Sequence, residues 1–228
     1  PYYAYARQDR KDRPRVAISA KLIADLLETA GFSRVLTIDL HANQIQGFFN
    51  MPVDNLIALP TVISYFKNME GLDLDNVVVV SPDAGGVERA RLFSQEIHAG
   101  LAIAYKSRPE PGVARLMHII GDVQGKDTII VDDIIDTAGT MVQTVHGLKD
   151  KGASRVFSVC THGLFSGEAV DRIENSPLEK VYVSDTVPLK GRKAECRKIG
   201  VLSVSELFAR AINSIHEEAS VSELFLVK

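Results

Sequence analysis

The sequence predicts an α/β fold in which mostly parallel strands are flanked by helices on both faces. Three observations favour this fold class. Strand-like and helix-like segments alternate along the chain, apolar runs such as NVVVV at 76–80 suit strands buried on both faces, and polar residues directly follow several of these runs. Because ligands bind at the carboxyl ends of strands in such sheets, we expect a site there.

The expected elements follow one another in a regular order. A helix is expected at 19–31, where Ser19 would be the N-cap and Gly31 the stop. Further helices are expected at 60–69, 84–100, 140–152, 168–175 and 204–216. Strands are expected at 34–40, 76–80, 101–105, 117–120, 128–131, 155–161 and 180–184. Pro109, Pro111 and Gly112 break regular structure, so a mobile loop is expected there.

Composition and charge exclude several classes of protein. The chain has 228 residues with 26 basic and 29 acidic side chains, so it lacks the basic excess of a general nucleic-acid binder. It contains no run of about 18 apolar residues, which excludes a transmembrane helix, and no visible signal peptide. The two cysteines, Cys160 and Cys196, lack metal-type spacing and suit a reducing compartment. We therefore expect a cytoplasmic protein with no membrane or nucleic-acid partner.

Four expected strand ends carry side chains that could bind a ligand. These groups are His41, Asp83 with the following Gly85 and Gly86, Lys106 with Arg108, and Asp132 with Asp133. One polar strand end is ordinary, but four together outline a site.

The decapeptide VDDIIDTAGT at 131–140 combines carboxylates with a loop suited to an anion. Thr137–Thr140 lead into a helix, where backbone N–H groups and hydroxyls can cradle a phosphate. The carboxylates of Asp132 and Asp133 repel phosphate but accept hydrogen bonds from sugar hydroxyls. A sugar phosphate satisfies both requirements; the alternative is that Asp136 caps the helix and the other acids are merely solvated.

The same decapeptide resembles the phosphoribosyl-pyrophosphate binding loop of the type I phosphoribosyltransferase fold. Other segments narrow the resemblance: YARQDRK at 5–11, DLHANQIQGFF at 39–49, SPDAGG at 81–86, THGLFSG at 161–167 and SVSELF at 220–225. In this order, and over essentially the whole chain, they resemble ribose-phosphate pyrophosphokinase, also called phosphoribosyl-pyrophosphate synthetase.

The resemblance implies two phosphoribosyltransferase-like domains, of which the first is incomplete. Chains of the family begin roughly ninety residues earlier, so this sequence resembles an N-terminally truncated member. Residues 1–59 would be the remnant of the N-terminal pyrophosphokinase domain, and residues 60–205 the C-terminal phosphoribosyltransferase-like domain. The tail at 206–228 would pack back on the first domain.

The resemblance also implies a magnesium-dependent transferase of nucleotide biosynthesis. In the family, the diphosphoryl group of ATP moves to the C1 hydroxyl of ribose 5-phosphate, which gives phosphoribosyl pyrophosphate and AMP. Such a transfer depends on charge neutralisation and alignment. Family members are homohexamers built from dimers, so a homo-oligomer is expected.

Site residues are carried over from the family's motifs. Catalytic roles fall to Lys106 and Arg108, and ATP binding to Arg7, Gln8, Asp9 and His41. Magnesium binding falls to His41 and Asp83. Ribose 5-phosphate binding falls to Asp132, Asp133, Asp136, Thr137, Ala138, Gly139 and Thr140. A regulatory phosphate or ADP site would involve Gln46, Asp54, Asn55, Ser220 and Phe225.

Two other functions remain open at the level of sequence. The chain could be a catalytically impaired, truncated or associated subunit that regulates full-length chains. It could also be a phosphoribosyltransferase that acts on a base, because those enzymes share the 131–140 loop; they lack the strings at 7–9 and 39–41. If the resemblance to the family is set aside, Arg7 is expected to belong to a solvated basic run and His41 to be a structural histidine.

Overall fold

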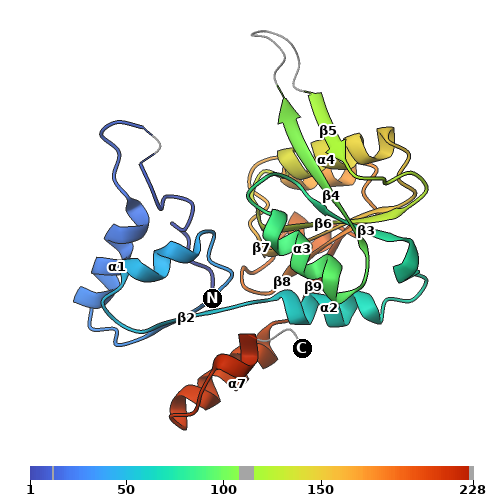
Figure 1. The fold of residues 1–228 in the computed structure, drawn as a ribbon. Helices are drawn as coiled ribbons and strands as arrows, with labels where there is room; N and C mark the ends of the chain where they lie inside the picture. The colour runs from blue at the N-terminus through green and yellow to red at the C-terminus, as the bar shows by residue number, and fades with distance from the viewer. Residues whose placement is uncertain (12, 108–115, 226–228) are drawn as a thin grey trace. The chain divides into compact units, whose positions relative to one another are not determined.

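The computed structural model describes residues 1–11, 13–107 and 116–225, and their contacts divide the chain into two compact units (Figure 1). Unit 1 contains Pro1–Ala58 together with the segment that begins at Ser205, and unit 2 contains Leu59–Val204. Within the described part of the chain, every helix is too short or too polar to cross a membrane.

Unit 2 is built around a seven-stranded sheet. Its strands are β3 (Val77–Ser81), β4 (Gly100–Ser107), β5 (Leu116–Ile120), β6 (Asp127–Ile135), β7 (Val156–Gly163), β8 (Lys180–Ser184) and β9 (Ile199–Leu202). Their order is β5-β4-β3-β6-β7-β8-β9, and every neighbouring pair is parallel except β4 with β5. The predicted fold class, an α/β fold with parallel-dominated sheets, is confirmed.

Helices cover both faces of this sheet. They are α2 (Leu59–Lys67), α3 (Val87–Glu96), α4 (Gly139–Asp150) and α5 (Ala169–Glu174), with the short α6 (Arg192–Glu195) and η2 (Leu74–Asn76) in connections. α3 contacts α2, β3, β4 and β6, whereas α4 contacts α5, β5, β6 and β7. Because β3 leads to β4 in one direction and β6 leads to β7 in the other, right-handed crossovers place α3 and α4 on opposite faces.

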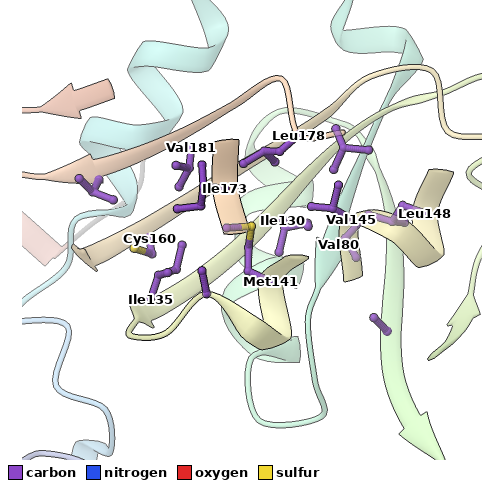
Figure 2. Packing of buried hydrophobic residues seen from close by; sticks show 14 of the residues in the cluster. Val80, Ile130, Ile135, Met141, Val145, Leu148, Cys160, Ile173, Leu178 and Val181 are labelled. Carbon is purple, nitrogen blue, oxygen red and sulfur yellow. The ribbon is translucent and has the colours of Figure 1, made fainter. Parts of the chain in front are cut away.

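The main apolar core lies between the sheet and the helices α4 and α5 (Figure 2). Ile130 of β6 and Val181 of β8 pack there with Met141 and Val145 of α4 and Ile173 of α5. All five side chains are at least nine-tenths buried. Burial on both sides explains why the central strands are continuous apolar runs in the sequence.

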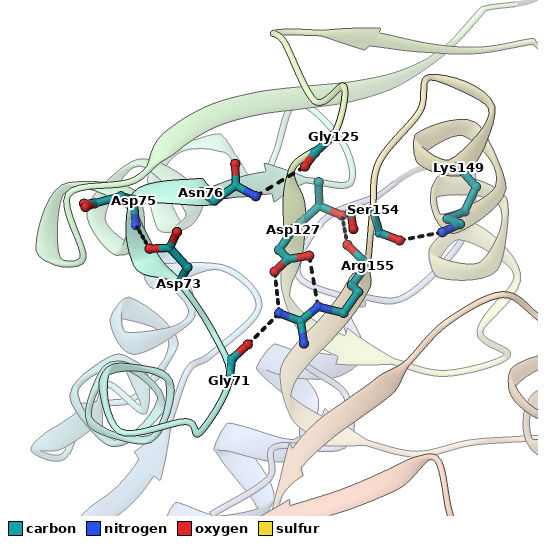
Figure 3. Close-up of polar contacts among 10 residues, drawn as sticks. Gly71, Asp73, Asp75, Asn76, Gly125, Asp127, Lys149, Ser154 and Arg155 are labelled. Atoms are coloured by element: carbon teal, nitrogen blue, oxygen red, sulfur yellow. Dashed lines mark hydrogen bonds and ion pairs between the residues drawn. The ribbon is translucent and has the colours of Figure 1, made fainter.

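A polar cluster fixes the amino-terminal edge of the sheet (Figure 3). The guanidinium of Arg155 donates from Nε to Oδ1 of Asp127 at 3.0 Å and from Nη2 to Oδ2 at 2.5 Å. Nη2 also donates to the carbonyl of Gly71 at 2.8 Å. The pair therefore ties the start of β6 to the residue before β7 and to the connection that precedes β3.

Unit 1 contains a two-stranded parallel sheet with helices around it. Its elements are α1 (Ser19–Thr29), β1 (Val35–Ile38), η1 (Asn43–Phe48), β2 (Val53–Leu56), α7 (Ser205–His216) and η3 (Ser222–Phe225). Ala6, Leu40 and Ile45 form a small buried cluster, against which Tyr3 and Phe49 pack. This cluster joins the turn at 5–10 to the segment that follows β1.

Several predicted boundaries were wrong. Ser19 is the first helical residue of α1 and not its N-cap, which is Ile18, and no side chain caps this end. Gly31 does follow the helix, with φ +90°. The helix expected at 84–100 is shorter, because residues 84–86 belong to a turn and His98 has φ +55°. The structure also adds β2 and β9, which the sequence did not predict.

Candidate active site

The candidate site lies where the sheet reverses its winding order. β3 and β6 are parallel neighbours, and the crossovers that follow them run to opposite sides. The loops after these two strands therefore diverge from one point at the carboxyl edge, which is where open α/β sheets bind ligands. The sequence placed Asp83 in one of these loops and residues 136–140 in the other.

The loop after β3 is organised around the Asp83 carboxylate. Its Oδ1 accepts hydrogen bonds from the backbone N–H groups of Gly85 at 2.8 Å and Gly86 at 3.0 Å. A Cβ on Gly86 would lie 3.0 Å from Oγ of Ser81, so this tight turn favours glycine. The Asp83 residue itself is exposed. An oriented, exposed carboxylate is a suitable oxygen ligand for Mg²⁺.

The aspartates of the decapeptide lie inside β6 and not after it, since β6 continues to Ile135. The pairing with β7 includes Asp132 and Ile134 but skips Asp133. Burial, a hydrogen bond with the Asp133 side chain and repulsion from its charge raise the pKa of Asp132 to about 8. The two carboxyl groups are therefore close together in a weakly hydrated place.

A cation that the sequence reading missed lies beside this pair. Arg89 of α3 places Nη1 3.6 Å from Oδ1 of Asp133, and its charge partly offsets the rise in the pKa of Asp132. Arg89 lies three residues after Gly86, so it stands in the first turn of α3. In the sequence, only the short spacing from the Asp83 turn could have indicated that Arg89 lies near the site, because an arginine in a helix is ordinary.

The loop from Asp136 to Thr140 leads directly into α4. Ala138 is the N-cap of α4 and adopts a left-handed conformation with φ +58°, while Gly139 and Thr140 begin the helix. The first N–H groups of a helix have no partner inside the helix and carry its positive dipole. Ala138 is buried, whereas Thr137 and Thr140 are exposed. This geometry suits a phosphate group.

Unit 1 brings the expected ATP-binding residues of 7–9 next to the segment that contains His41. The backbone carbonyl of Gln8 accepts from the N–H of Ala20 at 3.2 Å, and Asp9 accepts a hydrogen bond from Gln44 at 2.8 Å. Arg7, Gln8 and His41 are exposed. The turn is thus anchored by its backbone and by Asp9, which leaves the Arg7 and Gln8 side chains on the surface.

The expected regulatory residues are in two places. Gln46 and Asn55 each bond to Asn43, at 3.2 Å and 3.4 Å, and Asn55 also accepts from the N–H of Leu40 at 3.0 Å. Asp54 forms an ion pair of 2.6 Å with Arg34. Ser220 accepts from the N–H of Ser222 at 3.1 Å, and Phe225 ends η3. Each therefore has a structural position within unit 1.

The remaining predicted residues are brought together only in part. Lys106 lies near the end of β4, the strand next to β3, whereas Arg108 lies outside the described residues. His41 belongs to unit 1 and Asp83 to unit 2. Among the described residues, no group of three or more His, Cys, Asp or Glu side chains could hold a metal alone. Mg²⁺ usually takes one or two carboxylates together with substrate phosphates, so the Asp83 carboxylate by itself is a suitable protein ligand.

Comparisons with known proteins identify the family to which this chain is similar. Residues 104–226 match the model of the phosphoribosyl synthetase-associated domain, and residues 1–31 match the N-terminal domain of ribose phosphate pyrophosphokinase. The chain is 53% identical to a ribose-phosphate pyrophosphokinase of Clostridium acetobutylicum and 51% identical to one of Aquifex aeolicus. Each match covers 99% of this chain and 70% or 71% of the relative.

A solved structure gives the same result. The crystal structure of phosphoribosylpyrophosphate synthetase from Mycobacterium smegmatis superimposes with a TM-score of 0.88 at 39% identity, covering 96% of this chain and 70% of that one. The common fold therefore extends over nearly the whole chain. The chain therefore belongs to the ribose-phosphate pyrophosphokinase family.

Proposed function

We propose that this chain is a ribose-phosphate diphosphokinase, which transfers the diphosphoryl group of ATP to the C1 hydroxyl of ribose 5-phosphate and releases AMP. The observation that carries this proposal is the switch point of the sheet, which is the carboxyl edge where the crossovers after β3 and β6 run to opposite faces. There, paired carboxylates and a helix-start loop meet, and only a ligand with both hydroxyls and a phosphate uses the two together. Membership of the family supports the same reaction.

Ribose 5-phosphate is the ligand of the β6 edge in this proposal. The 5-phosphate occupies the loop of Asp136, Thr137, Ala138, Gly139 and Thr140, where it accepts hydrogen bonds from backbone N–H groups. Asp132 and Asp133 accept hydrogen bonds from the sugar hydroxyls. Their positions in β6, next to the loop, support this division of the sugar phosphate.

ATP is the ligand of residues 7–9 and, through Mg²⁺, of His41 and Asp83 in this proposal. Arg7, Gln8 and Asp9 contact the nucleotide, with the Arg7 fork suited to phosphate or to a purine ring. His41 and Asp83 hold Mg²⁺, which when bound neutralises charge on the phosphates. Exposure of Arg7, His41 and Asp83 supports access for a ligand.

Lys106 and Arg108 supply cations to the diphosphoryl group during transfer in this proposal. The place of Lys106 at the end of β4, beside β3, supports it. We further propose a regulatory anion site at Gln46, Asp54, Asn55, Ser220 and Phe225, assembly into a homo-oligomer and a cytoplasmic location. We also infer that 1–59 belongs to the first domain of the family, 60–205 to the second, and that 206–228 returns to the first.

AMP formation tests this function directly. The chain is incubated with ATP and Mg²⁺ in phosphate buffer, with and without ribose 5-phosphate, alongside Asp133→Asn and Lys106→Ala. Asp150→Asn, at the exposed end of α4, is the control for removing one negative charge. We expect AMP only with the sugar phosphate, and loss of AMP in both site variants but not in the control. AMP that forms equally without sugar phosphate, or survives in Asp133→Asn, would refute the proposal.

A further inference from the structure

Residues 164–172 form hydrogen bonds with the loop that is proposed to bind phosphate. Backbone carbonyls of Ile135, Asp136 and Thr137 accept hydrogen bonds from the N–H of Leu164 at 2.9 Å, the N–H of Ser166 at 2.8 Å and Nη1 of Arg172 at 2.9 Å, respectively. Three carbonyls in succession are therefore held by residues 164–172. The last of the three bonds comes from a side chain of α5.

These bonds determine where the loop's N–H groups point. In a trans peptide the C=O of one residue and the N–H of the next point in opposite directions. Carbonyls of residues 135–137 point toward the segment 164–172, so the N–H groups of residues 136–138 point away from it. Successive N–H groups on one side of a loop can form an anion-binding concavity. The bracing bonds thus prepare the loop before any phosphate arrives.

The bracing segment is itself rigid at its beginning. Phe165 is 1% exposed and adopts φ +48°, which anchors the turn in the apolar core. A Cβ on Gly163 would lie 2.7 Å from the Phe165 ring and 2.8 Å from Val183, so only glycine fits there. Lys193 donates from Nζ to the carbonyl of Leu164 at 2.7 Å. Leu164 and Ser166 are therefore fixed donors.

Arg172 supplies the third of these hydrogen bonds from its side chain. Its Nη2 bonds to Oε2 of Glu168 at 3.1 Å, which orients the guanidinium, while Nη1 holds Thr137. Nη1 also lies 3.8 Å from the position of a Cβ on Gly139, at the start of α4. We propose that Arg172 is a positioning residue for the sugar-phosphate loop, acting through the Thr137 carbonyl. This inference rests on the proposed ribose 5-phosphate site.

Calorimetric titration of the whole chain tests the role of Arg172. Ribose 5-phosphate, and separately ATP with Mg²⁺, are titrated into wild type, Arg172→Met, Arg172→Lys and Arg192→Met. Arg192 of α6 pairs with Asp171 of α5 but is not bonded to the loop in any described contact, so it controls for losing an ion pair of α5. The apo melting temperature and amide exchange at 136–140 are measured for each variant.

We expect Arg172→Met to weaken ribose 5-phosphate binding about tenfold, the lower end of the loss that follows when hydrogen-bond partners of metal-binding side chains are removed. ATP affinity and the melting temperature should stay unchanged, amide exchange at 136–140 should accelerate, and Arg172→Lys should recover part of the loss. Equal ribose 5-phosphate affinity in wild type and Arg172→Met, or an equal loss in Arg192→Met, would overturn the inference alone. A wild type that binds no ribose 5-phosphate would overturn the proposed function and this inference with it.

Discussion

Replacing Asp132 by Asn should stabilise unit 2 as the pH rises, although it removes a proposed substrate contact. The ordinary aspartate pKa of 3.8 applies to the unfolded chain, whereas burial and the Asp133 carboxylate raise the pKa of Asp132 to about 8 in the folded chain. The folded chain therefore holds a proton that the unfolded chain releases between these values. As a result, the wild type loses stability as the pH rises from about 4 to about 8.

The size of this effect follows from proton linkage. One proton changes the free energy of unfolding by at most about 1.4 kcal/mol for each pH unit. Between about pH 5 and pH 7, the change in the free energy of unfolding is therefore at most about 2.7 kcal/mol. Asp132 keeps some accessible surface, so solvent screening reduces this change. We expect a change of about 1–2.7 kcal/mol. For a chain of this length, this corresponds to about 2–10 °C in melting temperature.

Calorimetric melting of unit 2 at the two pH values measures the effect. Wild type and Asp132→Asn are compared, and Asp150→Asn reports the general effect of removing one negative charge. The difference in melting temperature between Asp132→Asn and wild type should widen from pH 5 to pH 7, while ribose 5-phosphate affinity falls. A difference that stays constant or narrows with rising pH would refute the reasoning about Asp132.

Three further changes test the packing of unit 2. Gly163→Ala should lower the free energy of unfolding by about 1–3 kcal/mol in urea titration, because its Cβ would overlap the Phe165 ring; an unchanged midpoint would contradict the close approach. Ser158→Ala should be neutral or stabilising by up to about 1 kcal/mol, because this buried hydroxyl has no hydrogen-bond partner among the described residues; a clear loss of stability would show a missing partner. Arg155→Met should cost about 1–3 kcal/mol in the same titration, since it leaves the buried Asp127 carboxylate without this ion pair; Arg155→Lys, which keeps the charge, should cost less.

The sequence predicted the elements that have strong periodicity and failed on those that do not. β3 is a continuous apolar run that is buried at every position, and it was predicted within one residue. β2 and β9 have four residues each, and their side chains are mostly half-buried, so neither alternation nor a continuous run marks them. They form because neighbouring strands, β1 for β2 and β8 for β9, provide an edge with which to pair.

The extent of β6 shows a second limit. Two consecutive aspartates normally indicate the end of a strand, because strands disfavour aspartate. β7, however, offers backbone partners as far as Gly163, and pairing with it keeps Asp132 and Ile134 in the strand. Tertiary pairing therefore overrides local preference at the residues that are proposed to bind substrate. Such conflicts between local preference and fold are expected at functional sites.

The contacts of the site were less predictable than its residues. The motif strings named Asp83, Asp133 and the loop at 136–140, because their chemistry is visible in the residue types. Arg89 and Arg172 were not named, since an arginine on a helix surface is ordinary and its partner is distant in sequence. Arg89 contacts Asp133 and Arg172 contacts Thr137. The sequence predicted the helices that carry these arginines, but it did not predict which strand or loop each helix faces.

The two ends of β6 show why residue type alone does not separate structure from function. Asp127, at the amino-terminal end, is buried and held by both nitrogens of the Arg155 fork. Asp132, at the carboxyl end, is enclosed beside a second carboxyl group, and its pKa rises accordingly. The first aspartate stabilises the fold, whereas the second makes it less stable at neutral pH and is retained at the switch point. Because both residues flank the same apolar strand, only their partners distinguish a structural ion pair from a carboxyl group that is proposed to bind a ligand.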